Sequence, residues 1–207
     1  MIVLGLTGGI AMGKTTLARL LARRFRLPVH DSDATVHALF APGGRAVAAV
    51  AAAFPGTIAP DGGVDRAALG RRVCGDDAAL KRLEAIVHPL VRAEERAFLA
   101  AARRRRVPLV VLNVPLLFET KGERRCDAVM VVSCPPFLQA ARALARPGMD
   151  PARLSAIRAR QTPDAVKRRR ADIVVPTGLG RPFALRVARR ALRHLLGARR
   201  ADERTPG

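Results

Sequence analysis

Short apolar runs alternate with longer stretches of helical spacing along most of this chain. The runs lie at residues 2–6, 28–30, 107–114, 128–132 and 172–175, and they are rich in valine, leucine and isoleucine. Apolar runs of this length, without an alternating polar face, are typical of strands that are buried on both sides. Strands that alternate with helices predict an α/β fold, with a five-stranded, mostly parallel sheet flanked by helices.

The stretches between the runs predict helices. Leu17, Leu20, Leu21 and Phe25 fall on one face of a helix over residues 16–25. Further helices are expected over 34–41, 45–54, 65–74, 76–103, 135–146 and 181–196, and others begin at Asp150-Pro151 and Thr162-Pro163-Asp164. Pro89 is expected to break or kink the long helix near His88.

This order of elements suggests how the chain is divided. Residues 34–103 form a helical insertion between the second and third strands, which a minimal α/β core does not need. We therefore expect the insertion to hold a second substrate. The core would comprise residues 1–33, 104–134 and 171–197, with a helical lid region over 135–170. The polar residues 198–207 are expected to form a frayed tail.

The most specific motif lies between the first strand and the first helix. Residues 8–15 fit the phosphate-binding pattern G-x-x-x-x-G-K-[ST]. In such a loop, backbone N–H groups and a helix N-terminus face the phosphates of a nucleoside triphosphate. Lys14 would reach the β- and γ-phosphates, and the Thr15 hydroxyl would bind Mg²⁺. The predicted nucleotide-binding residues are Gly8, Gly9, Ile10, Ala11, Met12, Gly13, Lys14, Thr15 and Thr16.

Two carboxylates and a group on one helix are candidates for the remaining chemistry. Asp31 and Asp33 follow the second strand, and open α/β sheets bind ligands at the carboxyl ends of their strands. Either residue could orient an acceptor hydroxyl, and either could simply cap the helix that follows. Gln139, Arg142 and Arg146 share one face of a predicted helix, which fits either a solvated surface or a lid over the phosphates.

The net charge of +20 does not by itself indicate a nucleic-acid partner. Only four of the 37 basic residues are lysine and alanine is abundant, as codon bias in a GC-rich genome would produce. The chain has no Trp or Tyr for base stacking. Its three cysteines and four histidines show no metal-ligand spacing, and no apolar run is long enough to span a bilayer. We expect a cytoplasmic enzyme that binds neither nucleic acid nor membrane.

Several further motifs together resemble the dephospho-coenzyme A kinase family. They are G-L-T-G-G-I at 5–10 with G-K-T-T at 13–16, D-S-D at 31–33, H-P-L-V at 88–91, P-L-L-F-E at 115–119, Q-x-x-R-x-x-x-R at 139–146, and Gln161 followed by Lys167 and A-D-I-V at 171–174. The resemblance runs in order from about residue 2 to residue 178, and P-L-L-F-E with H-P is its specific part.

The resemblance implies a P-loop fold of the nucleoside-monophosphate-kinase type. It also implies transfer of the γ-phosphate of ATP to the ribose 3′-hydroxyl of dephospho-CoA, with Mg²⁺, by a monomer or weak homo-oligomer. By this resemblance Asp33, Lys14 and Arg142 are catalytic and Arg146 contacts the nucleotide. The implied acceptor-binding residues are Asp31, His88, Pro115, Leu116 and Glu119. His88 could instead bond to the backbone beside Pro89, and Glu119 could form a structural salt bridge.

Four positions depart from the family's pattern. Ala11 and Met12 replace its usual Gly-Ser, and an alanine fits poorly wherever φ must be positive. Asn113 stands where many members carry an acid, and Pro176 replaces an Asn whose surroundings often border the adenine. Lys14, Thr15 and Asp33 are all present, so an active enzyme with altered nucleotide affinity is expected.

Three alternatives remain open on the sequence. The chain could be a P-loop kinase for a nucleoside, a nucleotide or a shikimate-like acceptor, which P-L-L-F-E and H-P disfavour. It could be a basic, nucleic-acid-stimulated NTPase, against which the missing aromatics and the neutral Asn113 count. It could also be a catalytically silent nucleotide-binding scaffold, which Ala11 and Met12 favour.

Overall fold

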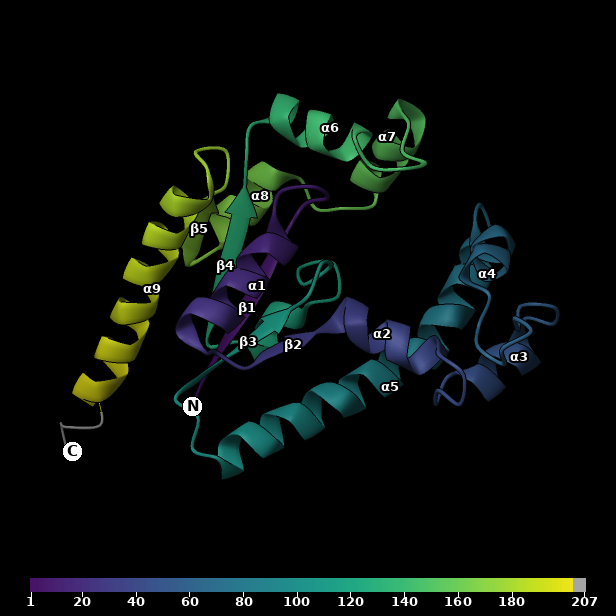
Figure 1. Ribbon diagram of the computed structural model, residues 1–207, viewed down its shortest axis with the longest axis horizontal. Coiled ribbons are helices and arrows are strands. Elements are labelled where there is room, and N and C mark those ends of the chain that lie inside the picture. Colours follow the sequence, from purple (N-terminus) through teal and green to yellow (C-terminus); the bar gives the residue numbers. More distant parts are fainter. Residues whose placement is uncertain (203–207) are drawn as a thin grey trace. The chain divides into compact units, whose positions relative to one another are not determined.

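The computed structural model describes residues 1–202 (Figure 1). The chain folds as two compact units. One contains Met1–His30 and the chain from Ala102 onward, and the other contains Asp31–Ala101. The second unit is thus an insertion into the first, as the sequence pattern suggested.

A five-stranded sheet forms the centre of the first unit. Its strands are β1 (Ile2–Gly8), β2 (Val29–Asp31), β3 (Leu109–Asn113), β4 (Ala128–Ser133) and β5 (Ile173–Pro176), in the order β2-β3-β1-β4-β5. β1 pairs in parallel with β3 and β4, and β4 pairs in parallel with β5. The predicted α/β fold is therefore confirmed. Pro176 is tolerated because β5 lies at the edge of the sheet, where a missing N–H donor costs no ladder bond.

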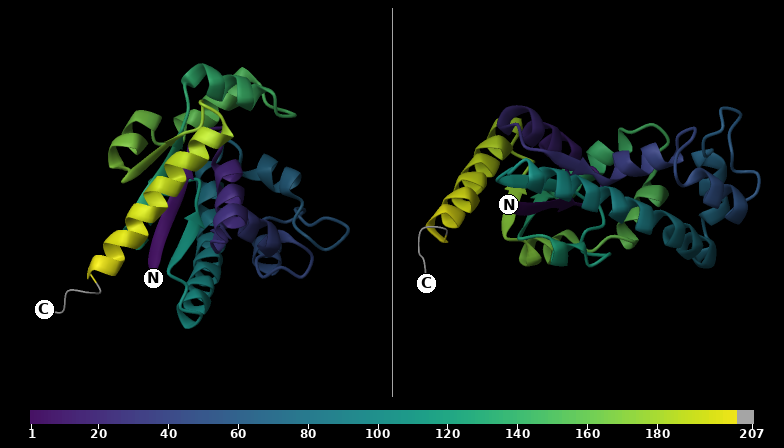
Figure 2. Two further views of the ribbon diagram at one scale, coloured as in Figure 1. Left: turned by 60° about the vertical axis from the view of Figure 1, so that its left-hand side comes forward. Right: turned by 90° about the horizontal axis from the view of Figure 1, so that it is seen from below.

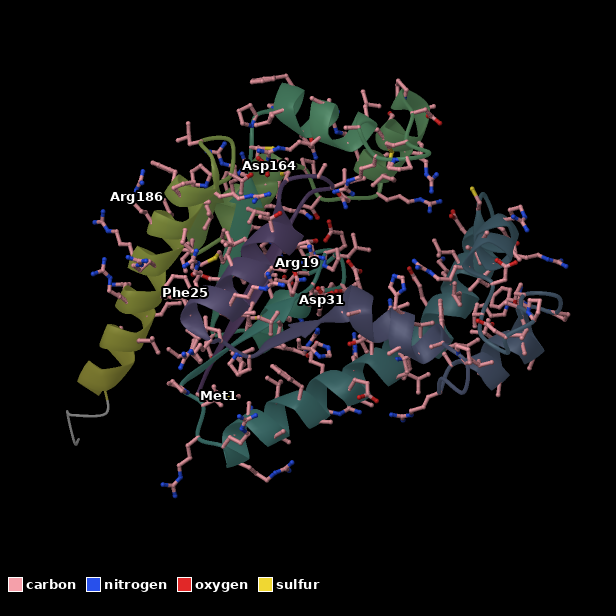
Figure 3. All side chains as sticks on the ribbon, in the orientation of Figure 1. Met1, Arg19, Phe25, Asp31, Asp164 and Arg186 are labelled. Carbon is pink, nitrogen blue, oxygen red and sulfur yellow. The ribbon has the colours of Figure 1, made fainter. Side chains whose placement is uncertain are left out.

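Helices α1 (Lys14–Phe25) and α9 (Arg181–Asp202) contact each other and share one core with the sheet. Figure 2 shows the two helices side by side. The strand pleat sends Met130 and Val132 into this core, while Val129 and Val131 pack on the other side with Leu117 and Phe118. Phe25, which is labelled in Figure 3, lies under the guanidinium of Arg189 at the end of α1. Burial on both faces explains why the strands read as continuous apolar runs.

The predicted lid region contains α6 (Pro136–Leu144), α7 (Pro151–Ala159) and α8 (Asp164–Arg170), and a short 3-10 helix, η1 (Gly122–Arg125), precedes β4. α6 ends at Leu144, so Arg146 lies beyond it and does not share the predicted helical face. Pro147 explains this end, because a residue that precedes proline is disfavoured in the helical conformation. Asp150 caps α7 as expected, with its Oδ1 2.7 Å from the N–H of Arg153.

The second unit is helical and has its own core. Its helices are α2 (Ser32–Phe40), α3 (Val47–Ala53), α4 (Arg66–Val73) and most of α5 (Asp77–Arg104). Phe40, Val50, Phe54, Leu69 and Val87 pack together at its centre. Because this cluster draws on all four helices, the insertion is a folded body rather than a long loop.

Of the predicted break or kink at Pro89, the break is wrong, since α5 continues through it. Proline removes the N–H that would bond to the carbonyl of Ala85. Ala85, His88 and Pro89 are exposed, so water can satisfy that carbonyl. On the opposite face, Val87 is buried in the core of the unit and holds the turns on both sides together. Packing therefore outweighs the lost hydrogen bond.

The closing helix is longer than predicted. α9 continues to Asp202, so the part of the expected tail from 198 to 202 is helical. The rest of that expectation, residues 203–207, lies outside the described residues. Across the described chain, no helix combines the length and the apolar character needed to cross a bilayer. The cytoplasmic location stays a prediction.

Candidate phosphate-transfer site

The N-terminus of α1 has the features of an anion-binding site. Gly13 is its N-cap, with φ 90°, and no side chain caps the helix or places an acid in its first turn. By contrast, Asp31, Asp65 and Asp150 cap α2, α4 and α7 with their carboxylates. The first-turn N–H groups of a helix have no partner within the helix. At α1 these donors and the positive end of the helix dipole stay available for phosphate.

Lys14 and the two threonines complete this anion site. Lys14 Nζ donates to Oδ1 of the fully buried Asn113 at 2.9 Å. Since an amide carries no charge, it orients the ammonium without neutralising it. Thr15 and Thr16 are exposed in the first turn of α1. An acid at position 113 would neutralise the charge of Lys14, and the amide of Asn113 does not.

The phosphate loop contains one strained residue. Ala11 has φ 58°, the left-handed conformation that favours glycine. The sequence raised this difficulty, and the structure places Ala11 in that conformation. Met12 beside it is buried in the core under α1, and its N–H bonds to the carbonyl of Gly9 at 3.2 Å. The two departures from Gly-Ser therefore differ, because Met12 packs well and Ala11 is strained.

Arg142 of the lid helix contacts the loop after β5. Its guanidinium donates to the carbonyl of Thr177 at 3.0 Å and to the hydroxyl of Thr177 at 3.3 Å. That hydroxyl in turn donates to the carbonyl of Met12 at 2.8 Å. Thr177 therefore links the arginine to the phosphate loop, and sequence reasoning missed it. Arg146 is exposed beyond the end of α6.

Glu119 takes part in a buried ion pair. Its Oε1 accepts from the N–H of Thr162 at 2.7 Å and lies 3.0 Å from Nζ of Lys167, whose side chain is fully buried. At this distance between opposite charges the contact is an ion pair within a buried setting. Burial acts to raise the pKa of Glu119, but the Thr162 amide and the Lys167 charge outweigh it and hold that pKa below its usual value. These contacts favour the structural role of Glu119.

Lys167 belongs to the family motif that begins at Gln161, but no role was predicted for it. It is one of only four lysines among 37 basic residues, as is Lys14. The predicted cap at Thr162 is wrong, because α8 begins at Asp164 without a side-chain cap. The N–H of Thr162 bonds to Glu119 instead. Pro115 and Leu116 lie in the same P-L-L-F-E segment as Glu119. The carbonyl of Pro115 accepts a hydrogen bond from the Thr7 hydroxyl at 3.0 Å, and Leu116 is 39% exposed.

The two aspartates of the second unit differ in their contacts. Asp31 is the N-cap of α2, and its Oδ1 accepts from the N–H groups of Asp33 at 3.0 Å and Ala34 at 3.2 Å. Figure 3 labels Asp31 at the start of this helix. The side chain of Asp33 is exposed, and within residues 1–202 no hydrogen bond or ion pair engages it. The helix cap considered for either residue is thus made by Asp31.

His88 lies on an exposed, basic face of α5 within the second unit. It lines an open pocket of about 550 Å³. The other lining residues are Lys81, Glu84, Ala85, Pro89, Arg92 and Arg96. The positive charges of Lys81, Arg92 and Arg96 outnumber the single negative charge of Glu84, so this pocket suits an anionic ligand.

Comparison with known proteins agrees with these features. A family model described as dephospho-CoA kinase matches residues 2–178. The dephospho-CoA kinase of Paramagnetospirillum magneticum is 69% identical over 166 residues, covering 80% of this chain and 77% of the relative. That of Rhodospirillum rubrum is 62% identical over 187 residues, covering 90% and 88%.

A solved structure has the same architecture. A crystal structure from Thermus thermophilus superposes with a TM-score of 0.79 at 34% identity, and the match covers 99% of this chain and 98% of that one. The phosphate loop, the lid helix and the P-L-L-F-E segment all fall within the residues that the family model matches. The chain belongs to the dephospho-CoA kinase family.

Proposed function

We propose that this protein transfers the γ-phosphate of ATP to the ribose 3′-hydroxyl of dephospho-CoA, the last step of coenzyme A synthesis. The observation that carries the proposal is the uncapped N-terminus of α1 with Lys14 beside it, in a chain of this family. An anion site of this kind suits the polyphosphate of ATP. Family membership supplies the acceptor.

The loop from Gly8 to Thr16 would bind the phosphates through its backbone N–H groups. Lys14 would contact the β- and γ-phosphates and stabilise the charge that develops during transfer. Arg142 would leave Thr177 and turn its guanidinium to the transferring group, which its half-buried position at the edge of the loop permits. Arg146, which is exposed, would add a second positive charge.

Asp33 would orient the acceptor hydroxyl and accept its proton. Its support is the contrast with Asp31, because Asp31 Oδ1 caps α2 whereas the carboxylate of Asp33 is open to solvent. Asp31 would then act on the acceptor mainly by fixing the backbone of Asp33. The basic pocket with His88 would hold an anionic part of dephospho-CoA, and Pro115 and the exposed Leu116 would border the acceptor.

Magnesium fits this arrangement through a single protein ligand. The exposed hydroxyl of Thr15 in the first turn of α1 is an oxygen donor next to Lys14. Among the described residues, no group of three or more His, Cys, Asp or Glu side chains could hold a metal ion. Mg²⁺ in kinases keeps several waters and takes further ligands from substrate phosphates, so one hydroxyl is enough. When bound, it would neutralise phosphate charge.

The test is ADP formation by the purified protein with Mg-ATP, with and without dephospho-CoA. ADP release that depends on dephospho-CoA, with phosphate found at the 3′ position of the product, is the expected result. Release that instead depends on shikimate or a nucleoside would assign another acceptor. Stimulation by nucleic acid that weakens steeply with salt would favour the nucleic-acid-dependent NTPase. ATP binding without any transfer would indicate a silent scaffold.

A further inference from the structure

Both hydrogen-bonding groups of one phosphate-loop residue, Ile10, are held by side-chain amides from the lid region. Gln139 Nε2 donates to the carbonyl of Ile10 at 2.9 Å. The N–H of Ile10 donates to Gln161 Oε1 at 3.0 Å. Gln139 lies on α6 and is buried, and Gln161 lies between α7 and α8. Two distant segments of the chain therefore meet at a single peptide position.

A further contact orients the amide of Gln139, and another holds the backbone next to Gln161. Arg158 of α7 donates to Gln139 Oε1 at 2.6 Å, which leaves the Nε2 end of that amide facing Ile10. Gln161 is followed by Thr162, whose N–H is held by Glu119. The buried charge of Lys167 fixes Glu119 in turn. The Gln139 amide is thus held at both ends, and Gln161 projects from a backbone segment that is itself held, so both are positioned without a ligand.

The loop is also shaped so that Gln139 can reach it. A Cβ at Gly9 would lie 3.1 Å from Gln139 Nε2 and 3.3 Å from Met12 Sδ, closer than such contacts normally come. The second glycine of the loop therefore makes room for the glutamine. A larger residue at position 9 would therefore disturb the hydrogen bond of Gln139 to Ile10.

We propose that Gln139 and Gln161 are positioning residues that hold the phosphate loop in its ATP-binding shape. A backbone carbonyl that turns toward the phosphates would repel them, and Gln139 keeps the Ile10 carbonyl turned away. Gln161 fixes the same residue from its N–H side. The lid region therefore sets the geometry of the loop even before its arginines act. The proposal rests on ATP being the ligand of this loop, as argued above.

The first test is the affinity for Mg-ATP, measured by calorimetry without acceptor, of Gln139→Leu and Gln161→Leu. Each substitution is expected to weaken ATP binding about three- to tenfold, because a positioning hydrogen bond is lost. The affinity for dephospho-CoA is expected to stay unchanged. Leu144→Ala, at an exposed position on the same helix, should leave both affinities unchanged. Wild-type ATP affinity in both glutamine variants would overturn the proposal.

The second test separates hydrogen bonding from charge. Gln139→Glu and Gln161→Glu each add one negative charge to the lid region. Gln161→Glu keeps an oxygen acceptor for the N–H of Ile10, whereas Gln139→Glu replaces a donor by an oxygen that faces the Ile10 carbonyl. We therefore expect Gln139→Glu to lose at least threefold more ATP affinity than Gln161→Glu. Equal losses would mean that only the charge matters, which contradicts the proposal.

These measurements distinguish the two proposals. If the wild-type protein binds ATP and the glutamine variants bind it more weakly, the positioning role holds even when dephospho-CoA is not phosphorylated. In that case only the proposed acceptor is wrong. If the wild-type protein does not bind ATP, both proposals fail.

Discussion

Helices α1 and α2 each begin soon after a strand of the sheet, yet their first turns are opposite in character. α1 has no capping side chain and no acid in its first turn, and Lys14 is its first residue. α2 is capped by Asp31 and carries Asp33 in its first turn. The same local element, a strand followed by a helix, thus presents uncapped N–H donors and a lysine in one case and two carboxylates in the other.

The difference shows how the two halves of a phosphoryl transfer can be divided. A helix N-terminus with free N–H donors stabilises negative charge on the donor nucleotide. An N-terminus whose donors are already satisfied by one carboxylate would repel phosphate, but it can hold a second carboxylate ready to take a proton. If this division is correct, changes at the two termini should have separable effects on ATP binding and on the transfer step.

The largest effect is expected from Asp33→Asn. Loss of a group that takes the acceptor proton should lower kcat by about 10²- to 10⁴-fold, while the affinity for ATP stays the same. Steady-state kinetics and calorimetry on the same preparation measure both quantities. Asp77→Asn is the matched control, because Asp77 is an exposed acid in the first turn of α5. A variant that keeps its kcat would move the chemical role to Asp31.

The next effect comes from placing an acid in α1, which makes its first turn resemble that of α2. Thr16→Glu should weaken ATP binding about tenfold more than Thr16→Gln, because the new charge opposes both the helix dipole and the phosphates. The difference in ATP affinity between the two variants should become smaller at high ionic strength, where exposed charges are screened. Equal affinities at low salt would show that the phosphates bind away from this turn.

A smaller effect is expected from removing the cap of α2. Asp31→Ala should cost about 1 kcal/mol of unfolding free energy, and Asp31→Ser should restore most of it because serine also caps helices. If Asp31 acts through the backbone of Asp33, from whose N–H it accepts a hydrogen bond, kcat in the alanine variant should fall less than in Asp33→Asn. Thermal unfolding and kcat are the measurements. If Asp31→Ser restores stability but stays as inactive as Asp33→Asn, the carboxylate of Asp31 is itself required.

Some of the features on which these predictions depend could be predicted from the sequence, and others could not. The loop before α1 and the cap of α7 were predictable because a few consecutive residues determine each of them. The predicted helix break at Pro89 was wrong because packing of the opposite helical face outweighed the local preference of proline. Val87 on that face is buried in the core of the second unit. The cap at Thr162 failed for a related reason, since its N–H bonds to a side chain far away in the sequence.

The contacts of Ile10 lay beyond sequence reasoning altogether. Gln139 and Gln161 are more than a hundred positions from the residue that they hold. Nothing in the spacing of either glutamine points to the phosphate loop, because the contact exists only once the lid helices have packed. Asp31 and Asp33 were an intermediate case. The sequence identified both as possible helix caps, and the hydrogen bonds of Asp31 show that it is Asp31 that caps α2.

The smallest effect concerns the loop that leads into α1. Ala11→Gly should raise the unfolding free energy by about 0.5 kcal/mol, because glycine relieves the left-handed strain at φ 58° but loses more entropy on folding. Ala156→Gly is the matched control, since Ala156 is exposed within α7, and it should lower stability by up to about 1 kcal/mol. The opposite signs of two identical substitutions in thermal unfolding would show that strain at Ala11 is real. A loss of stability in both would mean that packing of the Ala11 methyl group against Ala143 and Leu154 outweighs the relief of strain.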